Sequence, residues 1–99
     1  MKIVAVTACP TGIAHTYMAA ERLERTAKKM NLDIKVETQG AMGIENELEQ
    51  EDIAHADAVI FAADIAVQKK ERFDGLKIIE TSVQDAIKNP EGILQKIAG

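Results

Sequence analysis

The stretch that decides the fold is KIVAVTACPTGIAHT, residues 2–16. Its first five residues are mostly apolar and predict a short strand, and the helical pattern that follows it predicts a long helix. Cys9 therefore lies in the loop between a strand and a helix. In open α/β sheets such loops, at the carboxyl ends of the strands, form the ligand-binding sites. We expect the function to reside at this edge.

Three further strands are predicted, each by a different pattern. Apolar and charged residues alternate over residues 32–37, as in a half-buried edge strand with Glu37 on its polar side. Residues 58–63 (AVIFAA) form a continuous apolar run, which is typical of a central parallel strand buried on both faces. Residues 77–81 (KIIET) predict the last strand.

The segments between these strands carry loop and helix patterns. Residues 38–43 contain two glycines and predict a loop. An acidic helix is expected over residues 45–56, and a short helical segment through Val67 and Phe73. The chain is expected to end in two helices, over residues 82–88 and 91–98.

This alternation predicts an α/β fold with an open four-stranded parallel sheet, in the order 2-1-3-4, and with helices on both faces. Such an arrangement is Rossmann-like, or flavodoxin-like. The loops after all strands then share one edge of the sheet. The residues expected at that edge are Cys9, Gly40, Gly43, Asp64 and Ser82.

Length, net charge and cysteine content limit the kinds of protein that this chain can be. A chain of 99 residues is long enough for one domain with one core. A formal net charge of −4 argues against nucleic acid as the main partner, because phosphate backbones require a basic face. A single cysteine excludes an intramolecular disulfide and favours a reducing compartment.

Targeting signals are not expected. The residues before Cys9 superficially resemble a lipoprotein cleavage box, but they fall short of the ~15–30 residues of a secretory signal. No run approaches the ~18 apolar residues that span a bilayer. We therefore expect a cytoplasmic protein.

The loop around Cys9 has the features of an anion site. Amides at a helix start lack intrahelical partners, and the helix dipole stabilises both a bound anion and a thiolate. Thr11 and Thr16 offer hydroxyl groups to an oxyanion or, equally, to the helix cap. Gly12 would let the loop backbone approach a phosphate. A nucleophilic sulfur in such a loop suggests phosphoryl chemistry.

Two neighbouring residues have open roles. His15 would either neutralise phosphate charge or bond locally in the first helical turn. Asp64 would either cap the next helix or touch the site, and capping is the better interpretation. Lys69, Lys70 and Arg72 form a small basic cluster that we expect to be exposed.

No cofactor or metal is expected. Neither a dinucleotide fingerprint nor a P-loop follows the first strand. Cys9, His15 and His55 do not make a zinc set, since structural zinc sites use four ligands at closer paired spacings.

The cysteine segment resembles a known family. Residues 7–16 (TACPTGIAHT), continued by MAAE at 18–21, closely resemble the active-site segment of fructose-specific enzyme IIB domains of the bacterial sugar phosphotransferase system. Similar matches occur at residues 37–43, 56–60 and 63–64, and at Arg72-Phe73, so that the resemblance covers essentially the whole chain.

The resemblance implies one phosphotransferase IIB domain over residues 1–99, acting as a protein-phosphocysteine–sugar phosphotransferase. Cys9 would take a phosphoryl group from a phosphohistidine on a IIA partner. It would pass this group to a sugar, fructose or a similar one, bound by a membrane IIC partner, at the inner face of the cell membrane. The implied phosphate-binding residues are Pro10, Thr11, Gly12, Ile13, Ala14, His15 and Thr16, with Gly40, Gly43 and Asp64 around the site.

Three alternatives remain from the residues alone. Cys9, five residues, then His15-Thr16 has the spacing of a cysteine-based phosphatase loop, but His15 replaces the arginine that clamps phosphate. A thiol redox protein would need a resolving cysteine, and the sequence has none. An anion-sensing module would use the loop without chemistry on sulfur.

Overall fold

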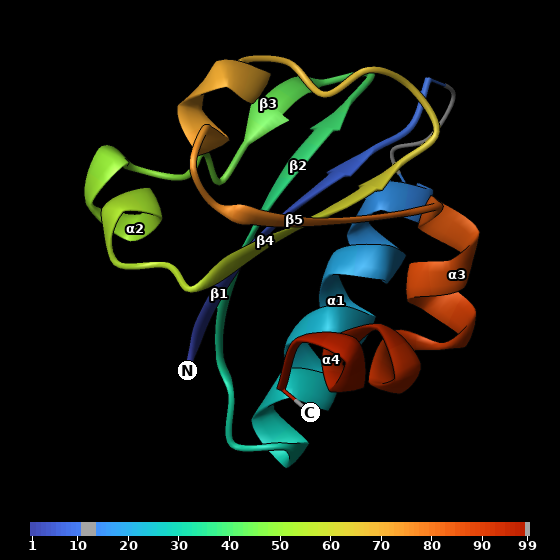
Figure 1. The fold of residues 1–99 in the computed structure, drawn as a ribbon. Helices are drawn as coiled ribbons and strands as arrows, with labels where there is room; N and C mark the ends of the chain where they lie inside the picture. The colour runs from blue at the N-terminus through green and yellow to red at the C-terminus, as the bar shows by residue number, and fades with distance from the viewer. Residues whose placement is uncertain (11–13, 99) are drawn as a thin grey trace.

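The computed structural model describes residues 1–10 and 14–98. Its centre is a five-stranded mixed sheet in the order β3-β2-β1-β4-β5 (Figure 1). The strands are β1 (Lys2–Ala8), β2 (Asp33–Gly40), β3 (Gly43–Glu45), β4 (Ala58–Ala63) and β5 (Lys77–Thr81). The helices are α1 (Ala14–Lys29), α2 (Gln50–Ala54), the 3₁₀ helix η1 (Lys70–Phe73), α3 (Val83–Lys88) and α4 (Pro90–Ala98).

The two central strands are β1 and β4, and their apolar runs explain this position. β1 pairs in parallel with β2 on one side and with β4 on the other. From Ile3 to Ala8 every residue of β1 is buried, as is β4 from Ala58 to Ala62. Parallel strands covered on both faces need apolar side chains at successive positions, and these two sequences supply them.

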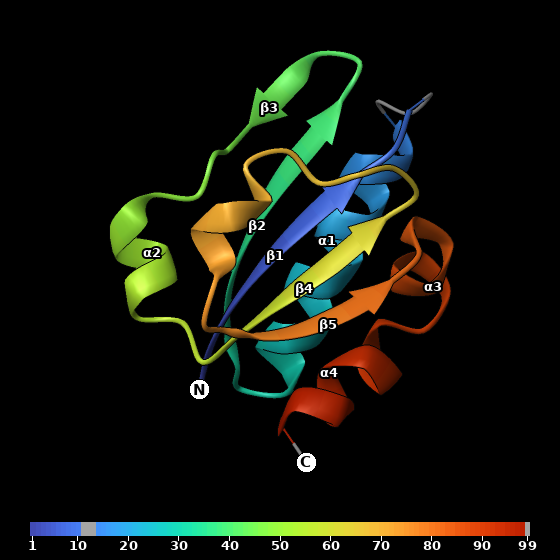
Figure 2. The same cartoon turned by 45° about the horizontal axis from the view of Figure 1, so that its top comes forward.

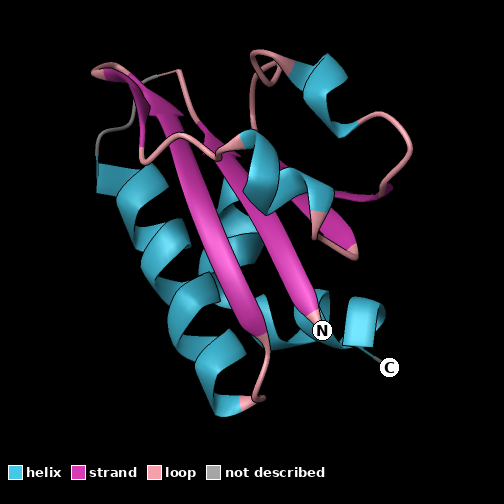
Figure 3. Ribbon diagram, turned by 90° about the vertical axis from the view of Figure 1, so that its left-hand side faces the viewer, coloured by secondary structure: helices cyan, strands magenta, loops and turns pink. Residues whose placement is uncertain are grey.

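The two faces of the sheet are covered unequally (Figure 2, Figure 3). Helices α1, α3 and α4 cover one face and enclose the larger core, in which Leu23, Ile60 and Leu94 are fully buried. Within the described residues, the other face is covered by α2, η1 and their loops, over a smaller core around Phe61 and Phe73, whose rings pack edge to face 5.3 Å apart. The predicted helices on both faces are present, but one layer is much thinner.

The predicted purely parallel four-stranded sheet is wrong in one respect. The four expected strands are present, parallel to one another and in the predicted order, but a fifth strand, β3, pairs antiparallel with β2. β2 continues through Gly40, where a loop was predicted, and Gly43 pairs with Gly40 across the turn. Gly43 has a φ of +87°, a conformation that favours glycine, and this permits the tight return of the chain.

Two predicted helices are shorter than expected. The acidic segment 45–56 begins as the end of β3, and only Gln50–Ala54 is α-helical. The segment through Val67 and Phe73 is helical only as η1. Each segment packs on the smaller core through a few apolar side chains. Helices in proteins are stabilised mainly by packing of an apolar face, so that so small an interface does not support a long helix.

None of the helices in the described ranges, 1–10 and 14–98, has the length and apolar character needed to cross a membrane.

Candidate functional site

Cys9 follows β1 directly and lies at the carboxyl edge of the sheet, as predicted. Its N–H donates to the carbonyl oxygen of Gln39 at 3.2 Å, which extends the β1–β2 pairing by one residue. The residue is 5% exposed and lines a cavity of about 480 Å³. The surface of the cavity also includes His15 and Asp64. Three residues singled out from the sequence therefore meet at one opening.

The start of α1 is fixed to the end of β1. The Thr7 hydroxyl donates to the carbonyl oxygen of Thr16 at 3.1 Å, and both side chains are buried. This bond places the first turn of α1, which begins at Ala14, beside Cys9. The amides of a first helical turn point out of the helix, so that they favour an anion at this position.

The proposed phosphate-binding residues are only partly described. Pro10, Ala14 and His15 are exposed, and His15 lines the cavity, whereas Thr16 is buried in the first turn of α1. Thr11, Gly12 and Ile13 lie outside the described residues.

The prediction that Asp64 caps the next helix is wrong, because its carboxylate binds the start of a helix further along the chain. Its N–H donates to the carbonyl oxygen of Ala8 at 2.9 Å, and its Oδ1 accepts from the N–H of Val83 at 3.3 Å. The carboxylate thus caps the start of α3, not of the helical segment that follows Asp64 in the chain. It also lines the cavity with Cys9. Asp64 therefore joins β1, β4 and α3 next to the thiol.

Gly40 and Gly43 lie at the same sheet edge but away from the cavity wall. Gly40 follows Gln39, the residue paired with Ala8, and Gly43 lies across the hairpin turn from it. Among the described residues that form the wall, neither glycine occurs.

Several wall residues were not predicted. They come from the exposed side of α1 and from α3, and they are Met18, Val83, Gln84, Ile87 and Lys88. Ser82, which was predicted at this edge, is the N-cap of α3, where its Oγ accepts from the Asp85 N–H at 3.0 Å. The sequence therefore indicated the end of β5 and the N-cap Ser82, whereas the residues that line the cavity belong to α3, the helix that follows.

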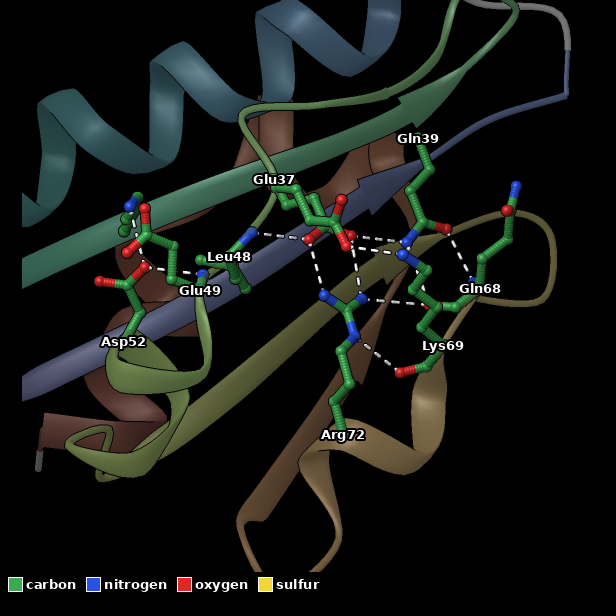
Figure 4. A network of polar contacts seen from close by, with 10 residues as sticks. Glu37, Gln39, Leu48, Glu49, Asp52, Gln68, Lys69 and Arg72 are labelled. Atoms are coloured by element: carbon green, nitrogen blue, oxygen red, sulfur yellow. Dashed lines mark hydrogen bonds and ion pairs between the residues drawn. The ribbon is translucent and has the colours of Figure 1, made fainter.

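A buried polar cluster lies beside this edge on the thinner face of the sheet (Figure 4). Glu37 was predicted to be on the polar side of an edge strand, but it is 0% exposed. Its carboxylate accepts from Arg72 Nη1 at 2.9 Å and Nη2 at 3.0 Å, from Gln39 Nε2 at 2.7 Å and from the Leu48 N–H at 2.9 Å. Arg72, expected to be exposed, is a partner of this buried group.

The electrostatics of the cluster follow from these bonds. Burial alone would raise the pKa of Glu37, but the hydrogen bonds that its carboxylate accepts, led by those from Arg72, hold the pKa below its ordinary value. In turn, the bond to Glu37 raises the pKa of Arg72. Both groups are therefore ionised, because the hydrogen bonds and the opposite charge outweigh the cost of burial.

Comparison of the whole chain with known proteins points to one family. Residues 4–96 match the family model described as PTS system, Lactose/Cellobiose specific IIB subunit. The PTS system fructose-like EIIB component 2 of Escherichia coli (strain K12) is 54% identical over 96 residues, which cover 97% of this chain and 91% of that protein. The PTS system fructose-specific EIIB component of Haloferax volcanii is 50% identical over 97% of this chain and 60% of its own length.

A solved structure agrees in fold as well as in sequence. The crystal structure of a domain from the fructose-specific IIABC component of the PTS system from Borrelia burgdorferi superposes with a TM-score of 0.92 and 49% identity. The match covers 96% of this chain and 90% of that domain. From the family model, the relatives and the shared fold together, this chain belongs to the IIB subunit family of the sugar phosphotransferase system.

Proposed function

We propose that the chain carries a phosphoryl group on the Sγ atom of Cys9, between a phosphohistidine of a IIA partner and a sugar bound by a membrane IIC partner. IIB components are sugar phosphotransferases, so that family membership supports the reaction class. The observation that carries the assignment to Cys9 is its place: the end of β1, next to the first turn of α1, on the wall of an open cavity.

The reaction consists of two transfers. The Cys9 thiolate attacks the phosphorus atom, an S–P bond forms, and the P–N bond breaks with its electron pair going to the imidazole of the donor. In the second transfer, a sugar hydroxyl oxygen attacks the same phosphorus. The S–P bond then breaks, the thiolate is regenerated, and the hydroxyl proton is released.

The chain contributes position and charge to both transfers. Phosphoryl transfer requires alignment of the attacking and leaving atoms and stabilisation of the charge on the phosphoryl oxygens. In the proposal, residues 10–16 bind those oxygens, through loop and first-turn amides and through His15. Asp64 keeps α3 against the cavity, and Gly40 and Gly43 belong to the hairpin beside it.

The biological setting is part of the proposal. Residues 1–99 act as one IIB domain in the cytoplasm, held at the inner face of the membrane by the IIC partner. The names of the relatives favour fructose or a similar sugar as the acceptor. The transfers proposed for Cys9 use neither a metal nor a cofactor.

The overall reaction provides the test. Membranes that contain the IIC partner are supplied with phosphorylated IIA and sugar, and sugar phosphate is measured with and without this chain. We expect formation of sugar phosphate with the wild type and none with Cys9→Ser. Glu21→Gln, which removes an exposed ion pair on α1, is the control and should match the wild type. Activity of Cys9→Ser equal to that of the wild type would rule out the carrier role.

A further inference from the structure

Gln39 connects Cys9 to the segment that contains Asp64. Its carbonyl oxygen accepts from the Cys9 N–H at 3.2 Å. Its side-chain amide pairs with the main chain of Gln68: Oε1 accepts from the Gln68 N–H at 2.8 Å, and Nε2 donates to the Gln68 carbonyl oxygen at 3.2 Å. One residue therefore bonds both to Cys9 and to Gln68, which follows Asp64 of the cavity wall by four positions.

The orientation of the Gln39 amide is determined by Glu37. Nε2 donates to Glu37 Oε2 at 2.7 Å, and a carboxylate accepts but does not donate. A flipped amide would place its oxygen against both the carboxylate and the Gln68 carbonyl oxygen. The observed orientation is therefore the one that satisfies every polar atom of the clamp.

Arg72 also binds both Glu37 and the main chain of the segment that Gln39 holds. While it binds Glu37, its Nη2 also donates to the Gln68 carbonyl oxygen at 3.2 Å and its Nε to the Lys69 carbonyl oxygen at 2.8 Å (Figure 4). The main chain of residues 68–69 is thus fixed by two side chains. Gln39 is 1% exposed, so that water does not compete for these bonds.

We propose that Gln39 is a positioning residue for phosphoryl transfer at Cys9, acting by clamping the main chain of Gln68 while its own carbonyl oxygen holds the Cys9 amide. The inference rests on the proposed function. A group that aligns reacting atoms affects the rate of the transfer more than the binding of the donor, because small misplacements are costly in the transition state.

The test is Gln39→Met, which keeps the length of the side chain and removes the amide. The matched control is Lys35→Met on the same face of the same strand, which removes a 2.8 Å ion pair with Asp52 far from Cys9. Phosphorylation of Cys9 by a phosphorylated IIA is measured over a range of donor concentrations. We expect kcat to fall by about 10-fold or more in Gln39→Met with KM unchanged, as for a misaligned reactant, and no change in Lys35→Met.

A second measurement needs no donor. The alkylation rate of Cys9 by iodoacetamide as a function of pH reports the environment of the sulfur, and we expect the profile of Gln39→Met to differ from those of the wild type and Lys35→Met. Circular dichroism verifies that each variant is folded. If Gln39→Met does not fold, Gln39→Asn takes its place, since it keeps an amide that is too short to bridge Glu37 and Gln68.

Equal kcat values and equal alkylation profiles for the Gln39 variant and Lys35→Met would overturn the inference. A fall in kcat with an unchanged fold would support it. Failure of the wild type to accept phosphate would instead contradict the proposed function, and the alkylation profiles would still decide the role of Gln39.

Discussion

Arg72 and Glu37 form a two-bonded ion pair between η1 and β2, with Nη1 2.9 Å from Oε1 and Nη2 3.0 Å from Oε2. The carboxylate is fully buried, while 18% of the arginine side chain is exposed. The two residues are 35 positions apart in the chain. The pair therefore fixes η1 and its preceding loop to the sheet, on the face where few apolar contacts are available.

Arg72→Met should lower the free energy of unfolding by about 3 kcal/mol, because it leaves the buried Glu37 carboxylate without its positively charged partner. Urea denaturation measures the change. Arg25→Met is the control: it removes an exposed ion pair with Glu21 on α1 and should cost less than about 0.5 kcal/mol. Equal losses in the two variants would show that burial of the Glu37 carboxylate does not determine the cost.

Acid should weaken the fold through Glu37. Its pKa is lowered in the folded state from an ordinary value of 4.5, so that the folded state binds this proton less readily than the unfolded state. The stabilisation is fully present above pH 4.5 and is lost as the pH falls through the lowered value. Unfolding measured between pH 7 and pH 3 should show this loss in the wild type.

Glu37→Gln provides the comparison for that experiment. We expect it to be less stable than the wild type at pH 7, where Arg72 has lost its charged partner, and to lose less stability on acidification. A variant as acid-sensitive as the wild type would assign the effect to other carboxylates, such as Asp52, whose pKa the bond from Lys35 also lowers.

The side chain of Ser82 should stabilise the first turn of α3, the helix whose residues line the cavity beside Cys9. Ser82→Ala removes the acceptor for the Asp85 N–H and should cost about 1 kcal/mol, as is usual for an N-cap. Ser82→Thr keeps the hydroxyl and is the control. Hydrogen exchange at the Asp85 amide should accelerate in the alanine variant alone; equal rates in both variants would contradict a capping role.

The sequence predicted those parts of the fold that depend on local pattern. The apolar runs of β1 and β4 require burial on both faces wherever they occur, and the strand end before α1 located Cys9. The burial of Glu37 was not predicted, because a strand with alternating apolar and charged residues is expected to have one solvent-exposed face. Arg72, whose charge stabilises the buried carboxylate, comes from a distant segment of the chain. The helix α3 beside Cys9 was predicted, but its approach to the thiol depends on packing against α1, which no single segment encodes.

Phosphate on Cys9 should be retained in the absence of a sugar acceptor. The cysteine loop has the spacing of a phosphatase, yet His15 occupies the position of its arginine, so that the fork that clamps phosphate for hydrolysis is missing. We expect little inorganic phosphate from the isolated phosphoprotein over the time in which sugar transfer is complete. His15→Arg restores the clamp and should increase release. Rapid release from the wild type would favour a phosphatase.

The most direct test of the account is the intact mass of the protein after incubation with a phosphorylated IIA donor, compared with that of Cys9→Ser. We predict that the wild type gains one phosphoryl group, that tandem mass spectrometry places it on Cys9, and that Cys9→Ser gains none. A phosphoryl group on another residue, or a gain of equal size in Cys9→Ser, would contradict the central role of the thiol.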